Sequence, residues 1–173
     1  MTKKDAISII SKCATLYAAN LCDQQLAFVY RNDNNRAEFV EVTFRSNNFM
    51  HFTGIDTKNH IKANAFYRDA LDKRLKESNI KFKDNVAGTT TACLGLALHG
   101  NEYIPNTILK EDIRNITPKP PGKIFAIFRK PIRQNIYSEL TFQSSSIDIT
   151  KKCLPLDLLK KVDKSLFIQE TPS

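Results

Sequence analysis

The chain has 173 residues, which is enough for one domain that buries its own core without disulfide or metal staples. Hydrophobic residues make up 42% of it and charged residues 25%, proportions that are typical of a globular protein and exclude a disordered one. The net charge of +8 favours a polyanionic partner, and no run of about 18 apolar residues is present to span a bilayer.

The positive charge is concentrated along the sequence. From Ile113 to Ser138 there are six Lys or Arg and no acidic residue, whereas residues 1–112 carry 15 basic and 13 acidic side chains and residues 139–173 carry five of each. A basic stretch without neutralising acids attracts polyanions by releasing their counterions, so we expect a nucleic-acid phosphate backbone as the partner. The alternative is a solvated basic face that serves only solubility.

The cysteines and the start of the chain bear on its compartment. No two cysteines form the C-x-x-C pair of a zinc or redox site, so we expect free thiols and a reducing cytoplasm. The first apolar run is broken by Ser8, Ser11 and Lys12, unlike the core of a signal peptide. The four cysteines are Cys13, Cys22, Cys93 and Cys153.

The first half of the chain reads as helix, hairpin, connector and helix. A spacing near 3.6 and a capping box from Thr2 to Asp5 predict a helix over roughly 4–22. Residues 25–31 and 37–45 are rich in β-forming side chains and are separated by a polar turn, so they predict a hairpin. A short connector, 46–54, then leads to a second helical stripe between Thr57 and Glu77.

The second half is richer in strands. Residues 92–98 and 103–104 flank a turn and predict another hairpin, and 106–114 predict one helical turn. Residues 123–130 and 136–142 read as the last two paired strands, and an amphipathic pattern predicts a helix over 154–167. Without a repeat or a linker, this order predicts a single α+β domain over 1–173.

His51 is the first candidate for chemistry, because a histidine titrates near neutrality and can exchange protons with a ribose hydroxyl or a leaving oxygen. A structural hydrogen-bonding role is the alternative. His60 and His99 are weaker candidates, at a helix start and in a hairpin turn. The sequence lacks clustered metal ligands, a phosphate-binding glycine loop and a G-x-S-x-G elbow, so we expect no metal and no cofactor.

A nuclease that works without a metal needs a proton-transfer pair and cations that stabilise the phosphate charge. Arg129 and Lys130 end one predicted strand, while Tyr137 and Thr141 lie in the next, where antiparallel pairing brings neighbouring strands together. The alternatives are edge-strand charges that discourage aggregation and, for Tyr137, a half-buried aromatic.

Four phrases together resemble the phage- and prophage-associated branch of the barnase, EndoU, colicin and RelE-like nuclease superfamily. They are NFMHFTGI, AFYRDAL, CLGLALHGNEYIPNTILKEDIR, and KIFAIFRK followed by YSELTF. Over about 4–143, the resemblance implies N-terminal helices packed on a four-stranded antiparallel sheet, to which the sequence adds an N-terminal β-hairpin and a C-terminal helix. It also implies metal-independent RNase activity.

The resemblance implies site residues only at matching positions. These are His51 and Thr53 in the HFTG phrase; Asn106, Thr107, Lys110 and Arg114 in the PNTILKEDIR phrase; and Lys130 with Tyr137 in the last hairpin. Phe52 stands where the pattern has a smaller aliphatic residue.

We therefore expect a metal-independent endoribonuclease of phage or prophage origin. His51 serves as general acid or base, Lys130 stabilises the transition state together with Arg114 or Lys110, and Tyr137 and Thr53 position the phosphate. Arg129 adds to RNA binding. The alternatives on the same fold are a non-catalytic RNA- or DNA-binding module and a module that binds a host or immunity protein.

Overall fold

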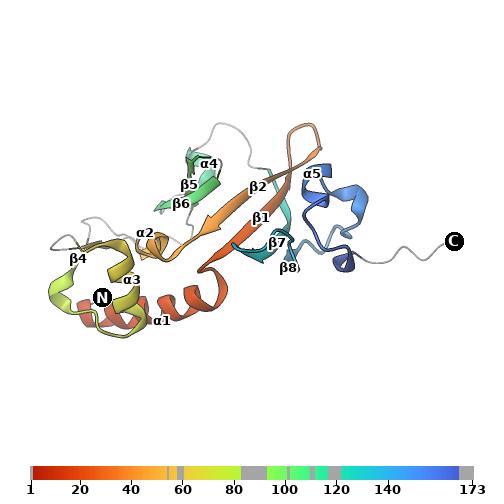
Figure 1. The fold of residues 1–173 in the computed structure, drawn as a ribbon. Coiled ribbons are helices and arrows are strands. Elements are labelled where there is room, and N and C mark those ends of the chain that lie inside the picture. Colours follow the sequence, from red (N-terminus) through yellow and green to blue (C-terminus); the bar gives the residue numbers. More distant parts are fainter. Residues whose placement is uncertain are drawn as a thin grey trace. The chain divides into compact units, whose positions relative to one another are not determined.

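In the computed structural model, whose helices and strands are labelled in Figure 1, the chain forms two compact units. Unit 1 comprises Met1–Asp23 and Phe44–Pro118, and unit 2 comprises Gln24–Thr43 and Lys119–Ser173. The expectation of a single domain stays a prediction. The structure describes residues 2–53, 55–57, 61–82, 93–100, 102–109, 112–116 and 122–167.

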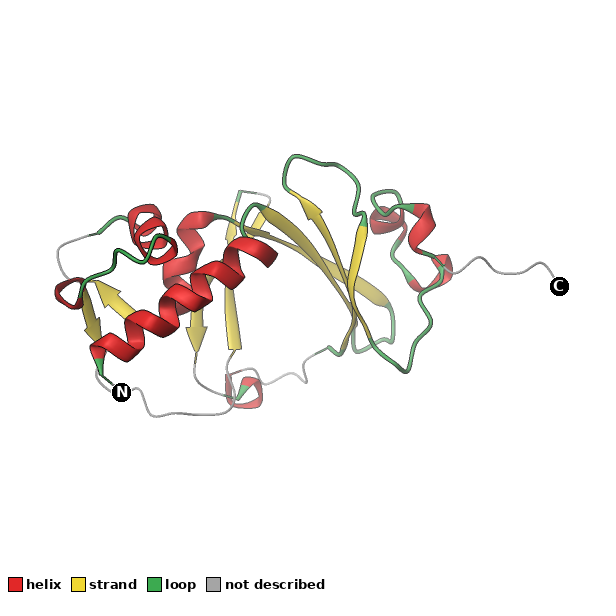
Figure 2. Ribbon diagram, turned by 90° about the horizontal axis from the view of Figure 1, so that it is seen from below, coloured by secondary structure: helices red, strands yellow, loops and turns green. Residues whose placement is uncertain are grey.

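Unit 1 begins with α1 (Lys3–Asn20), which confirms the first predicted helix. The capping box forms as expected: the Asp5 amide donates to Thr2 Oγ1 at 3.1 Å, and the Thr2 amide donates to Asp5 Oδ2 at 3.0 Å. A face at helical spacing is buried and packs against α3 and α2 (Figure 2). Its residues are Ala6, Ile10, Ala14 and Tyr17.

Three further short helical segments belong to this unit: η1 (Ser46–Asn48), α2 (Phe49–Thr53) and, later in the chain, α3 (Ala63–Leu71). Aromatic rings from α2 and α3 cluster with the Tyr17 ring of α1, and neighbouring ring centroids lie 5.2–6.2 Å apart. The rings are those of Tyr17, Phe49, Phe66 and Tyr67. Burying such large rings contributes about 2–3 kcal/mol each. The aromatic cluster is therefore the core that holds the helices of unit 1 together.

The second predicted helix is shorter than its apolar stripe. Thr57 lies in β3 (Ile55–Thr57), which pairs with β4 (Ile80–Phe82), and the helix begins only at Ala63. It ends at Leu71, because Lys73 takes a positive φ of 58°, a conformation that a continuing helix cannot contain. The segment η2 (Glu77–Asn79) follows.

The strands β5 (Cys93–His99) and β6 (Glu102–Leu109) confirm the predicted hairpin, turning at Gly100 with φ of 61°. The register shifts at Gly95/Leu96, so that Asn106 is the extra residue of a bulge next to Pro105. The helical turn predicted over 106–114 is therefore wrong in its first half, and α4 spans only Ile113–Ile116. Proline lacks an amide donor, which is why it is tolerated beside a bulge.

Unit 2 is built on β1 (Gln24–Arg31), β2 (Ala37–Phe44, whose last residue belongs to unit 1), β7 (Ile124–Pro131) and β8 (Glu139–Gln143). The first hairpin is confirmed; Asn32 Oδ1 accepts the amides of Asn34 and Arg36 at 3.0 and 2.9 Å, which fixes the turn. Antiparallel pairing joins β1 to β7 and β7 to β8, so the last predicted strand pair is also confirmed.

The predicted helix over 154–167 is wrong. The segment forms short pieces instead: η3 (Lys151–Cys153), α5 (Leu156–Leu159) and η4 (Lys164–Leu166). A bridge to Tyr137 interrupts it, because the Tyr137 amide donates to Lys161 O at 2.7 Å and the Asp163 amide donates to Tyr137 O at 2.9 Å. Those backbone groups would otherwise serve a continuous helix.

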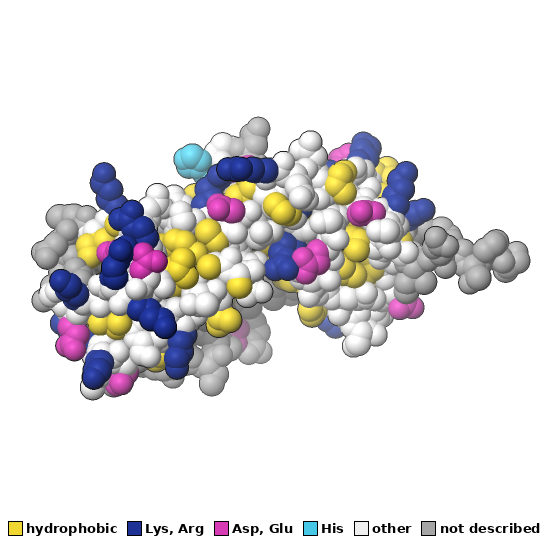
Figure 3. All heavy atoms as spheres, turned by 60° about the horizontal axis from the view of Figure 1, so that its bottom comes forward, with side chains coloured by type: hydrophobic (Ala, Val, Ile, Leu, Met, Phe, Trp, Pro, Cys, Tyr) yellow, Lys and Arg dark blue, Asp and Glu magenta, His cyan; other side chains and the backbone are white. Residues whose placement is uncertain are grey.

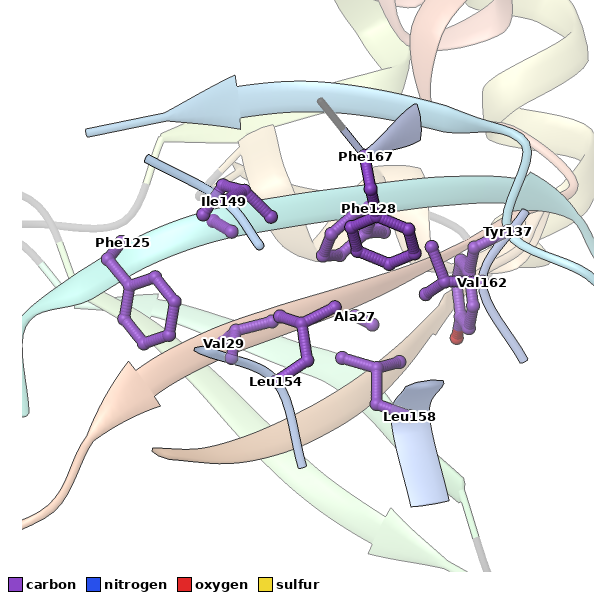
Figure 4. Packing of buried hydrophobic residues seen from close by; sticks show 11 residues of the cluster. Ala27, Val29, Phe125, Phe128, Tyr137, Ile149, Leu154, Leu158, Val162 and Phe167 are labelled. Atoms are coloured by element: carbon purple, nitrogen blue, oxygen red, sulfur yellow. The ribbon is translucent and has the colours of Figure 1, made fainter. Parts of the chain in front are cut away.

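These pieces close the core of unit 2. Figure 4 shows side chains from the C-terminal segment lying against those of β1 and β7. Burial of these side chains stabilises the C-terminal segment against the sheet, although the segment has little regular secondary structure. The members of this core cluster are Ala27, Val29, Phe125, Ala126, Phe128, Tyr137, Ile149, Leu154, Leu158, Val162 and Phe167.

The fold is α+β, but the expected four-stranded antiparallel sheet is wrong. The main sheet has six strands in the order β5-β6-β2-β1-β7-β8, and the sheet is mixed. The first hairpin is central in that order and not an addition to it, because β1 is bonded to β7 from the other end of the chain. One helix, α1, precedes all the strands. Within the described residues, no helix is long and apolar enough to cross a membrane.

Candidate functional site

The helix α2, which carries His51 and Thr53, is anchored by the buried side chain of Asn48. Asn48 Oδ1 accepts the Arg45 amide at 2.8 Å, and its Nδ2 donates to Pro105 O in β6 at 3.2 Å. Asn48 is 3% exposed, so these bonds satisfy both ends of a buried amide. The Tyr17 hydroxyl adds a bond to Arg45 O at 2.9 Å. The backbone that leads into α2 is thus fixed by both α1 and β6.

His51 is exposed on this anchored helix. The sequence placed it in a connector, and the structure places it in a helical turn, because Phe49 is buried in the aromatic cluster and fixes the turn. Thr53 Oγ1 donates to Met50 O at 2.8 Å. An exposed imidazole on a fixed backbone can exchange protons with a bound substrate. Within the described residues, no carboxylate hydrogen-bonds to the His51 ring.

An apolar groove of about 540 Å³ lies between α1 and α2. Leu16 and Ile9 line it and are 64% and 51% exposed, which is unusual for aliphatic side chains on a helix that also carries a buried face. Aromatic rings of the cluster form its floor and Thr53 lies at its α2 side, so the groove offers flat apolar surface next to the helix of His51. Its lining residues are Ile9, Ile10, Cys13, Leu16, Tyr17, Asn20, Leu21, Phe49, Phe52 and Thr53.

A second hollow of about 660 Å³ shares Leu16 with this groove. Three lysines line it, Lys4 and Lys12 from α1 and Lys73 from the residues after α3, together with the hydroxyls of Ser8, Ser11 and Thr15. Figure 3 shows Lys and Arg side chains around hydrophobic ones on the face that carries α1. Amines and hydroxyls are the groups that bind phosphate oxygens, so we name this surface the lysine hollow.

Two further site residues predicted from the sequence, Asn106 and Thr107, lie on β6. Asn106 is exposed at the bulge, and Thr107 is half-buried with its methyl group close to Gly95 of β5. Lys110 lies outside the described residues, and Arg114 lies in α4, where the structure describes its backbone only. Because α2 packs against β6, the structure brings the elements of His51 and Asn106 together.

Lys130 and Tyr137 come together in unit 2, where Lys130 Nζ lies 5.3 Å from the centroid of the Tyr137 ring. Both are buried, at 7% and 0% exposed. Lys130 Nζ donates to Gln134 O at 2.6 Å, and the Tyr137 hydroxyl donates to Glu41 Oε1 at 2.8 Å. Burial, followed by that bond to Glu41, raises the pKa of Tyr137 well above its usual value, so its phenol stays neutral.

Two further charged side chains complete this cluster. Lys161 Nζ donates to both carboxylate oxygens of Glu41, at 2.8 and 3.0 Å, which ties the C-terminal segment to β2. On the neighbouring strands Arg129 is held by Glu139 with two bonds of 2.7 Å and one of 2.9 Å. Each of these groups has a packing or pairing role within unit 2, so catalytic roles for Lys130, Tyr137 and Arg129 stay predictions.

Some contributors were not found from the sequence. The lysine hollow had a visible signal, since Lys4, Ser8 and Lys12 repeat at a spacing of four and form a polar stripe on one helix. The Glu41–Lys161 pair had no signal in the sequence, because its members are 120 residues apart.

The net charge is divided evenly between the two units. Unit 1 has 14 basic and 10 acidic residues, and unit 2 has 12 basic and 8 acidic residues, so each unit carries +4.

Comparison with known families bears on the segment that holds α2. Residues 9–92 match the family described as phage-Barnase-EndoU-ColicinE5/D-RelE like nuclease4. Over that segment the chain is similar to the phage branch of this nuclease superfamily. The superfamily recognition is thus confirmed, and a nuclease function in general is supported. No curated protein and no solved structure matches the chain.

The family match also sorts the candidate residues. His51, Thr53 and every lining residue of the groove lie within 9–92. The other candidates lie beyond it: Asn106, Thr107, Lys110, Arg114, Arg129, Lys130 and Tyr137. The phrases from Cys93 onward lie outside the matched segment. Within the described residues, no three His, Cys, Asp or Glu side chains gather as a metal site would require.

Proposed function

We propose that this chain is a metal-independent endoribonuclease of phage or prophage origin and that His51 is its general acid or base. The observation that carries the proposal is the position of His51: it is exposed on α2, whose backbone Asn48 fixes, and it lies inside the segment that matches a nuclease family. Proton transfer by a positioned side chain typically contributes a factor of about 10² to 10⁴ in rate.

The apolar groove and the lysine hollow, which both lie along α1, suit a single-stranded substrate. Bases stack on apolar and aromatic surface, and the groove between α1 and α2 supplies it. Phosphates are bound by amines and hydroxyls, and the lysine hollow that adjoins the groove at Leu16 supplies both. A strand that runs along α1 then places one nucleotide near Thr53 and His51.

The proposed reaction is transfer of the phosphoryl group to the ribose 2′-hydroxyl. His51 accepts the proton of that hydroxyl, the 2′-oxygen attacks the phosphorus, and the bond from phosphorus to the 5′-oxygen breaks. The leaving oxygen takes a proton from a water molecule or from a second acid. Lysine ammonium groups stabilise the charge on the phosphate as it develops. Lys130 and Tyr137 remain candidates for a role in this step.

The experiment compares RNA cleavage by wild type, His51→Ala and His99→Ala in excess chelator, with total tRNA and rRNA as substrate. His99 is an exposed histidine on β5 and serves as the matched control. We expect His51→Ala to lower the rate by roughly 100-fold or more and His99→Ala to leave it unchanged. Equal activity of all three proteins removes His51 from the site.

The alternative is a non-catalytic module that binds nucleic acid or a host protein. It is favoured by the lack, within the described residues, of a carboxylate that orients the His51 ring, since catalytic histidines are commonly held by a third group. Intact RNA in the wild-type reaction together with salt-sensitive RNA binding supports this reading. Intact RNA without RNA binding supports a host or immunity protein as the partner.

A further inference from the structure

The strand β5 is an edge strand with unusual chemistry. In the six-stranded order it stands at one end, with β6 as its bonded neighbour among the described strands. It is seven residues long, and its sequence CLGLALH has no Asp, Glu, Lys, Arg or Pro. Natural proteins protect such edges with charges, proline or bulges on the outer strand, and here the bulge residue is on β6.

The alternating leucines of β5 are solvent-exposed. Leu94, Leu96 and Leu98 share one face of the strand and are 39%, 37% and 64% exposed. Tyr103, which pairs with Leu98 across the hairpin, adds a ring that is 39% exposed. A contiguous apolar strip on an edge strand marks an interaction surface. The other edge strand, β8, differs because it carries Glu139, which is bound to Arg129.

We propose that β5 pairs with β5 of a second copy of this chain, antiparallel and centred on Leu96. The strand is self-complementary in this register: Leu96 faces Leu96 of the other copy, and Leu94 faces Leu98. The opposite face then brings Gly95 next to Ala97 and Cys93 next to His99, all small or uncharged. Isologous pairing of one strand with itself is the usual basis of a two-fold dimer.

The self-complementary leucine pattern points to a second copy as the occupant, and the charge distribution permits it. The chain carries +8, so two copies repel each other over most of their surfaces. None of residues 85–101 is Asp, Glu, Lys or Arg, so β5 lies within a neutral stretch in which that repulsion is weakest. A strand from a differently charged partner finds no side-chain charge on β5 to recognise, whereas the leucine pattern recognises itself. This inference does not depend on the proposed nuclease activity.

The first test is the mass of the wild-type protein in solution, by light scattering or sedimentation over a wide range of protein concentrations. We expect twice the 19.7 kDa monomer mass at high concentration. Leu96→Lys places two ammonium groups opposite each other at the dimer axis and weakens the dimer by roughly tenfold or more. Leu16→Lys is the matched control, an exposed leucine on α1, and leaves the dimer intact.

The second test fixes the register by disulfide cross-linking in a background whose natural cysteines are serine. Leu96→Cys places two thiols directly opposite each other, and we expect a cross-linked dimer on oxidation. In Leu94→Cys each thiol faces Leu98 of the other copy, and we expect little cross-linking. A wild type that stays monomeric at every concentration overturns the proposal and leaves the edge to a strand of another protein. Equal cross-linking of both variants overturns the register.

Discussion

Replacing Tyr137 by Phe tests the polar cluster that holds the C-terminal segment to the sheet of unit 2. The change keeps the ring, which is fully buried, and removes only the hydroxyl that donates to Glu41 at 2.8 Å. A hydrogen bond to a charged group contributes about 1.5–3 kcal/mol. Because Lys161 still binds both oxygens of Glu41, the carboxylate keeps partners, and we expect the lower end of that range, about 1.5–2 kcal/mol.

The same substitution has a pH signature. Burial and the Glu41 carboxylate raise the pKa of Tyr137 in the folded state above its ordinary value of 10.0. Above pH 10 the unfolded chain loses this proton while the folded chain keeps it, so the free energy of unfolding falls as pH rises. The slope for this one group is about 1.4 kcal/mol per pH unit. Tyr137→Phe lacks the group, so the advantage of wild type over the variant shrinks above pH 10.

Urea unfolding of wild type, Tyr137→Phe and Tyr30→Phe between pH 7 and pH 11 measures both effects. Tyr30 is the matched control, because its hydroxyl also donates to a glutamate, Glu38, at 3.0 Å, but in an exposed position where the bond contributes less. The reasoning is refuted if Tyr137→Phe loses no more stability than Tyr30→Phe. It is also refuted if the difference between wild type and Tyr137→Phe is the same at pH 9 as at pH 11.

Three further changes test other parts of the structure. Replacing Lys4, Lys12 and Lys73 by Gln should reduce the magnitude of the slope of log K against log salt for single-stranded RNA by about 2, measured by fluorescence anisotropy. The same change at the exposed Lys151, Lys160 and Lys164 should leave a steeper slope than the first triple variant has. Equal slopes for the two triple variants would argue against the lysine hollow. Gly95→Ala places a Cβ 2.6 Å from Thr107 Cγ2 and should cost about 1–2 kcal/mol, seen in thermal unfolding and relieved by Thr107→Ser; no loss would contradict the contact. The hydrogen bond with Thr150 lowers the pKa of Cys153 while burial raises that of Cys22, so near-neutral alkylation followed by mass spectrometry should label Cys153 before Cys22, and Thr150→Val should slow the labelling of Cys153.

The sequence alone predicted the elements whose causes are local. The capping box and the 3.6 spacing predicted α1, and the asparagine-rich turn predicted the hairpin of β1 and β2. The hairpin of β5 and β6 was predicted for the same reason, since the turn residues between its strands lie next to them in the chain. The superfamily was also recognised from the sequence, and His51 was singled out by residue type within the segment that the family match covers.

What the sequence could not decide depended on contacts between distant residues. The C-terminal pattern favoured a helix, but the backbone of residues 161 and 163 bonds instead to Tyr137, and no local signal announces that bridge. Tyr137 reaches Glu41 across 96 residues, a contact that no local pattern indicates, and its catalytic role stays a prediction. Pairing between β1 and β7 likewise made the first hairpin part of the main sheet, whereas the sequences of these two segments show only that each is a strand. Local propensity fixes an element's type, whereas its partners are chosen by burial and hydrogen bonding in the folded chain.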